Sequence, residues 1–367
     1  MTKTKEMLAK ATHSANQSVL KPKIKRPFSV AIVGATGVVG RETLSILQER
    51  DFPVSNLRLL ASERSAGEKI AFHDDEYTVE ILGEDSFKDI EVAFFCAGGS
   101  ISKKFAPVAA QHGAVCIDKS SHFRMDPDVP LVVPEVNPEA LADYSKKRII
   151  ASPNCSTIPL MQVLKPLNDT AGVSHVVAST YQAVSGAGKS GIEELEKQIR
   201  DMFNMRDVDT AVFKRRIAFN VLPMIPGADA MDEGGMTTEE AKMVNESRKI
   251  LNIPQLKISV TCVRVPVFNG HSEAVHIGLN EPLTIERVRD LLSASPGIVV
   301  IDNPENGVYP TPEDAAGEDM TLVGRIRPDT GFDNGVALWF SSDNLRTGAA
   351  LNAVRIAEHL CAEHLNQ

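Results

Sequence analysis

The chain has 367 residues, a formal net charge of −9 and a hydrophobic content of 43%. That length suffices for two domains with separate cores, and the composition is typical of a globular protein. The acidic balance, with no basic face or arginine-rich run to offset it, argues against a nucleic-acid partner. The longest apolar runs are broken by glycine and too short to span a bilayer, so we expect a soluble protein with no membrane partner.

Residues 1–26 carry many lysine, serine and threonine side chains, a single acidic residue and little apolar periodicity. We expect a disordered extension. An organelle-targeting segment is the alternative, although such segments favour arginine and Arg26 is the only one here. The expected location is therefore the cytoplasm, or an organelle such as a plastid if the extension is a targeting segment.

The segment FSVAIVGATGVVGRETLSILQER begins with a β-branched run and passes through Gly34, Gly37 and Gly40 into an amphipathic helix. This order predicts a dinucleotide-binding turn, in which the backbone approaches the pyrophosphate and the helix N-terminus meets its charge. Further strand and helix patterns follow in NLRLLAS, EVAFFCAGG with KKFAPVAAQHG, and AVCIDKSS. The first part of the chain is therefore predicted to be a Rossmann-like domain.

The run ASERSAG, at the end of the second predicted strand, indicates which dinucleotide is bound. Arg64, flanked by Ser62 and Ser65, suits the 2′-phosphate of NADP. Glu63 leaves NAD open, because its carboxylate could accept a hydrogen bond from a ribose hydroxyl. We favour NADP.

The five cysteines show no metal-ligand spacing, so we expect no metal site. Four lie in apolar patterns and are predicted to be buried hydrophobic residues: Cys96, Cys116, Cys262 and Cys361. An odd count without paired spacing fits a reducing, intracellular compartment.

Cys155 differs, because RIIASPNCSTIPL gives it polar neighbours between a predicted strand and a predicted helix. Pro153 discourages helix before it, so we expect a turn at Asn154 and Cys155 and a helix capped by Ser156 or Thr157. The helix N-terminus favours the thiolate, which makes Cys155 a candidate nucleophile. A buried structural thiol is the alternative.

A cysteine nucleophile beside a nicotinamide cofactor indicates aldehyde or acyl chemistry through a thioester. This chemistry needs a base and, for exchange with phosphate, cations. The segment VTCVRVPVFNGHSEAVHIGL offers Arg264 and His271. Its alternation predicts that Val263 and Val265 are buried and that Arg264 faces the other way, where it is solvated or binds a substrate carboxylate.

The run AVSGAGKSG, between a predicted strand and a predicted helix, suggests a nucleotide phosphate loop. Ala183 stands where that pattern needs its first glycine. A phosphate-loop ATPase would need Lys189 and would leave Cys155 without a task. We therefore expect these glycines to approach the nicotinamide and the thiol-bound substrate, and Lys189 to be solvated.

Motifs in chain order, among them GATGVVG, ASERSAG, SSHFRM, PNCSTI, TYQAVSGAG, NGHSE and DNLRTGAALNAV, closely resemble the aspartate-semialdehyde dehydrogenase family. The resemblance runs from about Val30 to Leu360. It implies reversible, NADPH-dependent reductive dephosphorylation of L-4-aspartyl phosphate to L-aspartate 4-semialdehyde, toward lysine, threonine and methionine. The alternatives are a related reductase, such as one for N-acetyl-γ-glutamyl phosphate, and a catalytically silent dinucleotide-binding regulator.

The resemblance also assigns residues. It makes Cys155 the nucleophile, His271 the acid/base and Gln182 the residue that orients the substrate. The substrate-binding residues that it implies are Arg264 for the carboxylate, Glu239 for the ammonium group, and Arg124, Asn154 and Lys242 for the phosphate. The cofactor-binding residues that it implies are Gly34, Thr36, Gly37, Val38, Val39, Arg64, Ser65, Ser185, Gly186 and Asn344. Without the resemblance, Glu239 and Lys242 would be taken for an exposed ion pair on one helix.

The implied fold is α/β with two domains. Residues 27–153 and 344–367 would form the NADP-binding domain, to which a C-terminal helix containing Asn344 returns. Residues 154–343 would form an α+β catalytic and dimerisation domain, in a homodimer or homotetramer. Ser152 departs from the family pattern, which often has asparagine there.

Overall fold

The computed structural model describes residues 21–225, 231–232 and 234–365, which form two compact units. The N-terminal unit contains Lys21–Asn154 and the chain from Ala349 onward, and the central unit contains Cys155–Gly348. Among the described residues, no helix is long and apolar enough to cross a membrane.

The N-terminal unit is built on a seven-stranded sheet of order β3-β4-β2-β1-β5-β6-β7. Its strands are β1 (Phe28–Val33), β2 (Val54–Ala61), β3 (Lys69–Phe72), β4 (Asp75–Ile81), β5 (Val92–Phe95), β6 (Val115–Asp118) and β7 (Ile149–Ala151). All neighbours pair in parallel except β3 and β4. Strand β1 is buried along its whole length, as the centre of a parallel sheet must be.

Helices and short turns join these strands. They are α2 (Val38–Glu49), α3 (Gly99–Gln111), η1 (Glu63–Ser65), η2 (Glu84–Phe87) and η3 (Pro138–Lys146). The chain order reverses between β1 and β5, and ligands of open α/β sheets bind beyond the carboxyl ends of the strands at such a point. The unit thus has the predicted Rossmann-like fold.

The C-terminal segment joins this unit, as expected from the sequence. It consists of η7 (Arg346–Ala350), a π-helical turn, then α9 (Leu351–His359) and η8 (Leu360–His364). Leu351, Val354 and Ile356 belong to the same core cluster as β1. Arg355 forms a buried ion pair with Glu135 at 2.5 Å.

The expected N-terminal extension is described only from Lys21, and residues 1–20 lie outside the described residues. Ile24 packs against the core of the N-terminal unit. Arg26 pairs with Glu91 at 2.8 Å and lies over the Phe28 ring. The end of the predicted disordered extension is therefore part of the folded unit.

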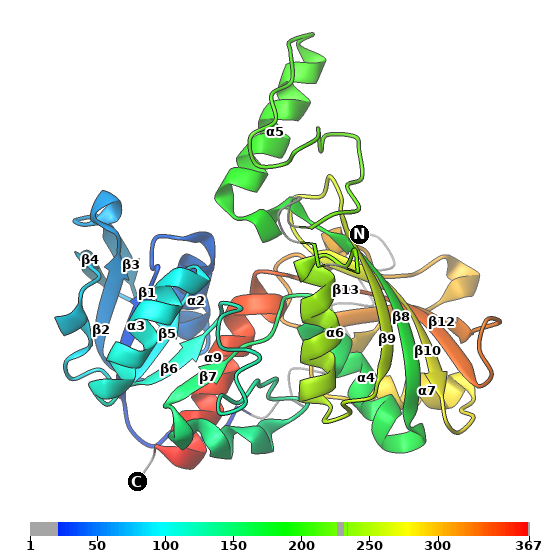
Figure 1. Cartoon of the computed structure of the whole chain (residues 1–367), viewed down its shortest axis with the longest axis horizontal. Helices are drawn as coiled ribbons and strands as arrows, with labels where there is room; N and C mark the ends of the chain where they lie inside the picture. Colours follow the sequence, from blue (N-terminus) through cyan, green and yellow to red (C-terminus); the bar gives the residue numbers. More distant parts are fainter. Residues whose placement is uncertain (1–20, 226–230, 233, 366–367) are drawn as a thin grey trace. The chain divides into compact units, whose positions relative to one another are not determined.

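The central unit contains a six-stranded mixed sheet of order β11-β12-β13-β10-β8-β9. Its strands are β8 (Val173–Gln182), β9 (Lys257–Arg264), β10 (His271–Leu279), β11 (Ile298–Val300), β12 (Thr321–Pro328) and β13 (Gly335–Ser342). Its helices and turns are α4 (Thr157–Ala171), η4 (Val184–Ala187), α5 (Lys189–Phe203), α6 (Thr238–Ile250), α7 (Ile285–Ser293), η6 (Pro304–Asn306) and α8 (Pro312–Ala315). Helices α4, α6 and α7 cover one face of the sheet, and α5 projects from it (Figure 1).

Candidate functional site

A row of buried polar side chains crosses the sheet of the central unit on the face that α6 covers. Gln182 on β8 pairs in register with Arg264 on β9. His271 begins β10, and its Nδ1 accepts a hydrogen bond from the backbone N–H of Ala183 at 3.1 Å. Gln182 and His271 are each 1% exposed and Arg264 is 6% exposed. The register thus brings together three of the predicted site residues.

The prediction for β9 was wrong for Val263 and Arg264, although Val265 just beyond the strand is buried as expected. Cys262 and Arg264 are buried, whereas Val263 between them is only half-buried. Cys262 contacts Met243 of α6 at 3.7 Å, so Arg264 shares the helix-covered face. Apolar alternation misplaced Arg264 because this face ends in a polar site rather than in core.

Glu240, a member of the capping box at the start of α6, also attaches the helix to β9. Thr237 caps the helix, and Glu240 accepts from the backbone N–H of Thr237 at 2.8 Å. The other oxygen of Glu240 accepts from the backbone N–H of Cys262 at 3.0 Å. This attachment places Glu239, in the first turn of α6, beside the end of β8.

Glu239 connects Gln182 with Lys242. Its Oε1 accepts from Gln182 Nε2 and its Oε2 from Lys242 Nζ, both at 3.1 Å. Glu239 is buried, so the pair is not the exposed surface pair of the alternative interpretation. The positive N-terminus of α6 also favours the carboxylate.

Thr180 fixes the orientation of the Gln182 amide, and sequence reasoning missed it. Its hydroxyl donates to Gln182 Oε1 at 3.1 Å, while Gln182 Nε2 donates to Glu239. These two hydrogen bonds identify which end of the Gln182 amide is the oxygen and which is the nitrogen. The sequence does indicate that the two side chains are neighbours, because a spacing of two residues on one strand places Thr180 on the same face as Gln182.

The ring of His271 is held neutral. Burial, and then the positive charge of Arg264, lower its pKa to about 3, against a weaker opposing effect of Glu239. Glu273, two residues along β10, is fully buried, and burial raises its pKa well above 4.5. Burial thus favours the neutral form of this carboxyl, and Glu273 is not among the groups that raise the pKa of His271.

The hydrogen bond from Ala183 decides where the proton of the neutral ring lies. Since Nδ1 accepts, Nε2 carries the hydrogen. Nε2 has no hydrogen-bond partner among the described residues. In this arrangement His271 offers a donor to a reacting group, and acting as a base at Nε2 would require the ring to abandon the hydrogen bond from Ala183.

Gly186 lies against both Arg264 and His271. A Cβ at this position would be 2.7 Å from Arg264 Nη1 and 3.3 Å from His271 Nε2. Arg264 Nη1 also donates to the backbone oxygen of Ala183 at 2.6 Å. The glycine-rich loop therefore approaches the site closely, as expected.

Cys155 lies half-buried just before α4. Ser156 occupies the N-cap position, as one of the two predicted alternatives, but its side chain makes no capping hydrogen bond, and Thr157 is already helical. Burial lowers the pKa of Arg264, and Glu239, followed by Cys155, opposes that effect.

Ser185 and Asn344 are hydrogen-bonded to each other. Asn344 Nδ2 donates to Ser185 Oγ at 2.9 Å, and Asn344 Oδ1 accepts from the Gly270 backbone at 3.0 Å. Asn344 lies in the turn between β13 and η7, not in the C-terminal helix as predicted. The chain must leave β13 before it turns helical, and Asn344 closes that turn.

The predicted cofactor residues of the N-terminal unit surround the turn after β1. Gly34 has φ +84°, and a Cβ at Gly40 would be 2.2 Å from the Gly34 oxygen, so the turn requires glycine at both. Gly37 caps α2, which begins with Val38 and Val39. This tight turn fits a pyrophosphate group at the helix N-terminus.

The loop after β2 lies beside this turn. Thr36 Oγ1 donates to Ser65 Oγ at 3.3 Å. Arg64 and Glu63 are both exposed in η1, so each is accessible to a ribose or its phosphate.

The predicted phosphate ligands are divided between the two units. Arg124 and Asn154 are buried in the N-terminal unit, whereas Lys242 belongs to the central unit. Arg124 donates to the backbone oxygens of Ser152 and Lys119, at 2.9 and 2.8 Å. Ser152, the departure from the family pattern, accepts from α9 through Asn352 Nδ2.

The phosphate-loop interpretation gains no support from this geometry. Lys189 begins α5, is largely exposed and lies 3.5 Å from Glu193, so it is solvated as expected. Across the part of the chain that the structure describes, no group of three His, Cys, Asp or Glu side chains could hold a metal ion.

Comparisons with known proteins agree with the predicted family. Residues 29–144 match the family model "Semialdehyde dehydrogenase, NAD binding domain" and residues 164–347 match "Semialdehyde dehydrogenase, dimerisation domain". The chain is 53% identical to the aspartate-semialdehyde dehydrogenase of Aquifex aeolicus over 92% of this chain and 99% of that protein.

Solved structures are also similar. Aspartate semialdehyde dehydrogenase II from Vibrio cholerae, complexed with ASA, has a TM-score of 0.90 and 47% identity over 93% of this chain and 100% of that one. The enzyme from Candida albicans with NADP has a TM-score of 0.69 and 26% identity over 92% and 99%. The chain therefore belongs to the aspartate-semialdehyde dehydrogenase family, as its motifs predict, and has a two-domain α/β fold with a dinucleotide-binding domain and a dimerisation domain.

Proposed function

We propose that the chain catalyses the reversible, NADPH-dependent reductive dephosphorylation of L-4-aspartyl phosphate to L-aspartate 4-semialdehyde. The observation that carries this proposal is the joining of a cation and an anion at one end of the central sheet: Gln182 pairs in register with Arg264 and donates a hydrogen bond to Glu239. A substrate with a carboxylate, an ammonium group and a reactive carbonyl needs a cation, an anion and a nucleophile. The family relatives act on or bind such molecules by name.

Cys155 is the nucleophile in this proposal. In the biosynthetic direction its thiolate attacks the acyl carbon, a thioester forms, and phosphate leaves with the electron pair of the broken bond. When bound, NADPH would supply the hydride that reduces this carbon. The adduct then releases the aldehyde and the thiolate.

The other side chains bind and orient. Arg264 pairs with the substrate carboxylate and Glu239 with its ammonium group, while Gln182 orients the carbonyl near the thiol. The Nε2–H of His271 donates to the oxygen of the adduct, which modifies the acid/base role expected from the family. Arg124, Asn154 and Lys242 bind the phosphate.

The cofactor residues complete the proposal. The turn after β1 binds the pyrophosphate through Gly34, Thr36, Gly37, Val38 and Val39, and Arg64 with Ser65 binds the 2′-phosphate. Ser185, Gly186 and Asn344 approach the nicotinamide. The N-terminal unit would be the NADP-binding domain and the central unit the catalytic and dimerisation domain, with the boundaries after Asn154 and Gly348 rather than after residues 153 and 343 as predicted.

We propose a homodimer formed through the sheet face opposite α6. Val177 and Tyr181 on β8 are 40% and 38% exposed there, which is unusual for large apolar side chains on a long strand. Light scattering would distinguish a dimer from the alternative tetramer, and Tyr181→Arg would weaken either assembly if this face forms the interface.

The proposed location is the cytoplasm, and fusion of residues 1–26 to a fluorescent protein tests the organelle alternative.

The test is formation of NADPH from aspartate semialdehyde, phosphate and NADP. The proposal predicts turnover that requires phosphate and disappears in Cys155→Ser, while NADP binding persists. Faster turnover of N-acetylglutamate semialdehyde would favour the related reductase. NADP binding without turnover of either aldehyde would favour the silent regulator.

A further inference from the structure

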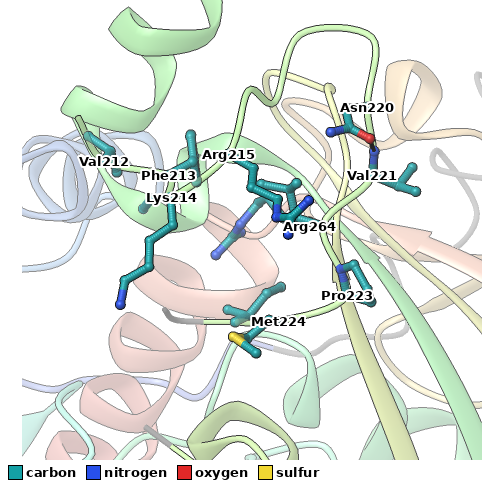
Figure 2. A pocket seen from close by; sticks show the side chains of 12 residues that line it. Val212, Phe213, Lys214, Arg215, Asn220, Val221, Pro223, Met224 and Arg264 are labelled. Atoms are coloured by element: carbon teal, nitrogen blue, oxygen red, sulfur yellow. Dashed lines mark hydrogen bonds between the residues drawn. The ribbon is translucent and has the colours of Figure 1, made fainter. Parts of the chain in front are cut away.

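A cavity of 590 Å³ opens on Arg264 from the side of the loop that follows α5. Residues 212–215 and 220–225 form most of its wall, with Ala187 of the glycine-rich loop. Figure 2 shows Arg264 in the middle of the labelled side chains, with Met224 and Pro223 on one side and Phe213 and Lys214 on the other. The cavity is thus mostly apolar but contains a buried guanidinium.

The wall of this cavity is firmly attached to α5. Glu194 accepts from the backbone N–H groups of residues 211–213. Gln198 Oε1 accepts from Ile217 and Ala218, at 2.9 and 3.1 Å. Both side chains are buried, so the loop is held by satisfied polar contacts at two places along the helix.

The back of the cavity is held as well. Leu222 exchanges two backbone hydrogen bonds with Arg264, at 2.8 and 2.9 Å. This bridge keeps the apolar segment 221–225 beside the guanidinium. Hydrogen bonds therefore hold both ends of the segment that lines the cavity.

The cavity is larger than the proposed substrate requires. A volume of 590 Å³ lies in the range of roughly 300–1,000 Å³ that holds drug-sized ligands, whereas aspartate semialdehyde has four carbons. Cys155 and His271 are not among the residues that line it. Space, apolar walls and a cation therefore occur together in this cavity.

We propose that this cavity binds an unbranched apolar carboxylate, whose carboxylate pairs with Arg264 and whose alkyl tail lies along Val221 and Met224. Lys214 and Arg215 at the wall add positive charge, which attracts the anion in a chain of net charge −9. Because Arg264 also binds the substrate carboxylate in the proposed function, such a ligand competes with aspartate semialdehyde.

The test uses butanoate, hexanoate and octanoate as probes. Isothermal titration calorimetry should show affinity rising by about fourfold per methylene, the effect of burying one such group. The corresponding alcohols should bind at least about tenfold more weakly, because they lack the charge that Arg264 pairs with. Octanoate should inhibit competitively against aspartate semialdehyde. Affinity that does not depend on chain length would overturn the proposal.

Two variants test where in the cavity the alkyl tail of the carboxylate binds. Val221→Trp and Val212→Trp place bulk at opposite parts of the wall, where both side chains are partly exposed and folding should survive. Each should abolish the chain-length dependence. Met205→Trp is the matched control, because Met205 is 94% exposed and does not line the cavity.

The outcomes separate this inference from the proposed function. Chain-length-dependent binding that the filling variants remove, in a protein without dehydrogenase activity, would refute only the proposed function. If binding depends on chain length but the carboxylates do not compete with aspartate semialdehyde, the proposal that both ligands pair with Arg264 would be refuted. Equal binding by the filling variants and the control would refute the cavity as the site.

Discussion

Replacing His271 by asparagine or by glutamine separates the functions of its two ring nitrogens. Asparagine can keep an acceptor for the backbone N–H of Ala183, which Nδ1 accepts at 3.1 Å, but it has no donor near Nε2. Glutamine reaches further and can place an amide N–H near Nε2. We expect His271→Asn to lower kcat by about 10²–10³, the usual cost of a lost oxyanion donor, and His271→Gln to recover at least about tenfold of it.

The neutral ring also has a measurable effect on stability. Its pKa is about 3 in the folded protein, against about 6.5 in an unfolded chain. The depressed pKa of a histidine means that the unfolded state binds the proton first, so stability is lost as the pH falls below 6.5. From this group alone the free energy of unfolding should fall by about 2 kcal/mol between pH 8 and pH 5, and by about 4 kcal/mol at pH 3.

Urea unfolding and pH–rate profiles check this reasoning together. Between pH 8 and pH 5 the wild type should lose about 2 kcal/mol more unfolding free energy than His271→Gln. Its profile of kcat/KM should show no His271 ionisation between pH 5 and pH 8. A limb near neutral pH that vanishes in both variants, with both equally inactive, would refute the neutral donor and restore His271 as the acid/base.

Three further substitutions test other parts of the site. Gly186→Ala should leave the protein folded by circular dichroism but lower kcat/KM, because the new Cβ would lie 2.7 Å from Arg264 Nη1; unchanged kinetics would contradict that approach. Glu239→Gln should raise KM for aspartate semialdehyde by roughly 10–100-fold, the loss of one charged hydrogen bond, and unchanged activity would argue against the assigned substrate. Arg64→Ala should raise KM for NADP but not for NAD, whereas equal effects on both would assign the 2′-phosphate elsewhere.

The fold was largely predictable because it depends on patterns that are local in the chain. The run from Phe28 to Arg50 passes from a mostly apolar strand through a glycine turn into an amphipathic helix, and the structure has β1 and α2 there. The return of the C-terminal segment was predictable only through the family motif around Asn344. Apolar periodicity alone does not say which sheet a terminal helix covers.

The site was predictable in its residues but not in its contacts. Arg264 was placed on the wrong face because the inner face of β9 ends in a polar site. Asn344 was placed in a helix because the family motif was taken as one helical segment, whereas the chain turns after β13 before it becomes helical at Arg346. Thr180 was missed because the two-residue spacing places it on the same face as Gln182 but does not report the side-chain rotamer on which their hydrogen bond depends.

Cys155 as the carrier of a thioester is tested most directly by rapid mixing with aspartate semialdehyde and NADP in the absence of phosphate. We expect a burst of about one equivalent of NADPH per chain, because the thioester forms once and has no acceptor. Adding phosphate should start steady turnover, and Cys155→Ser should show neither phase. Steady NADPH formation without phosphate, or an undiminished burst in Cys155→Ser, would contradict the thioester.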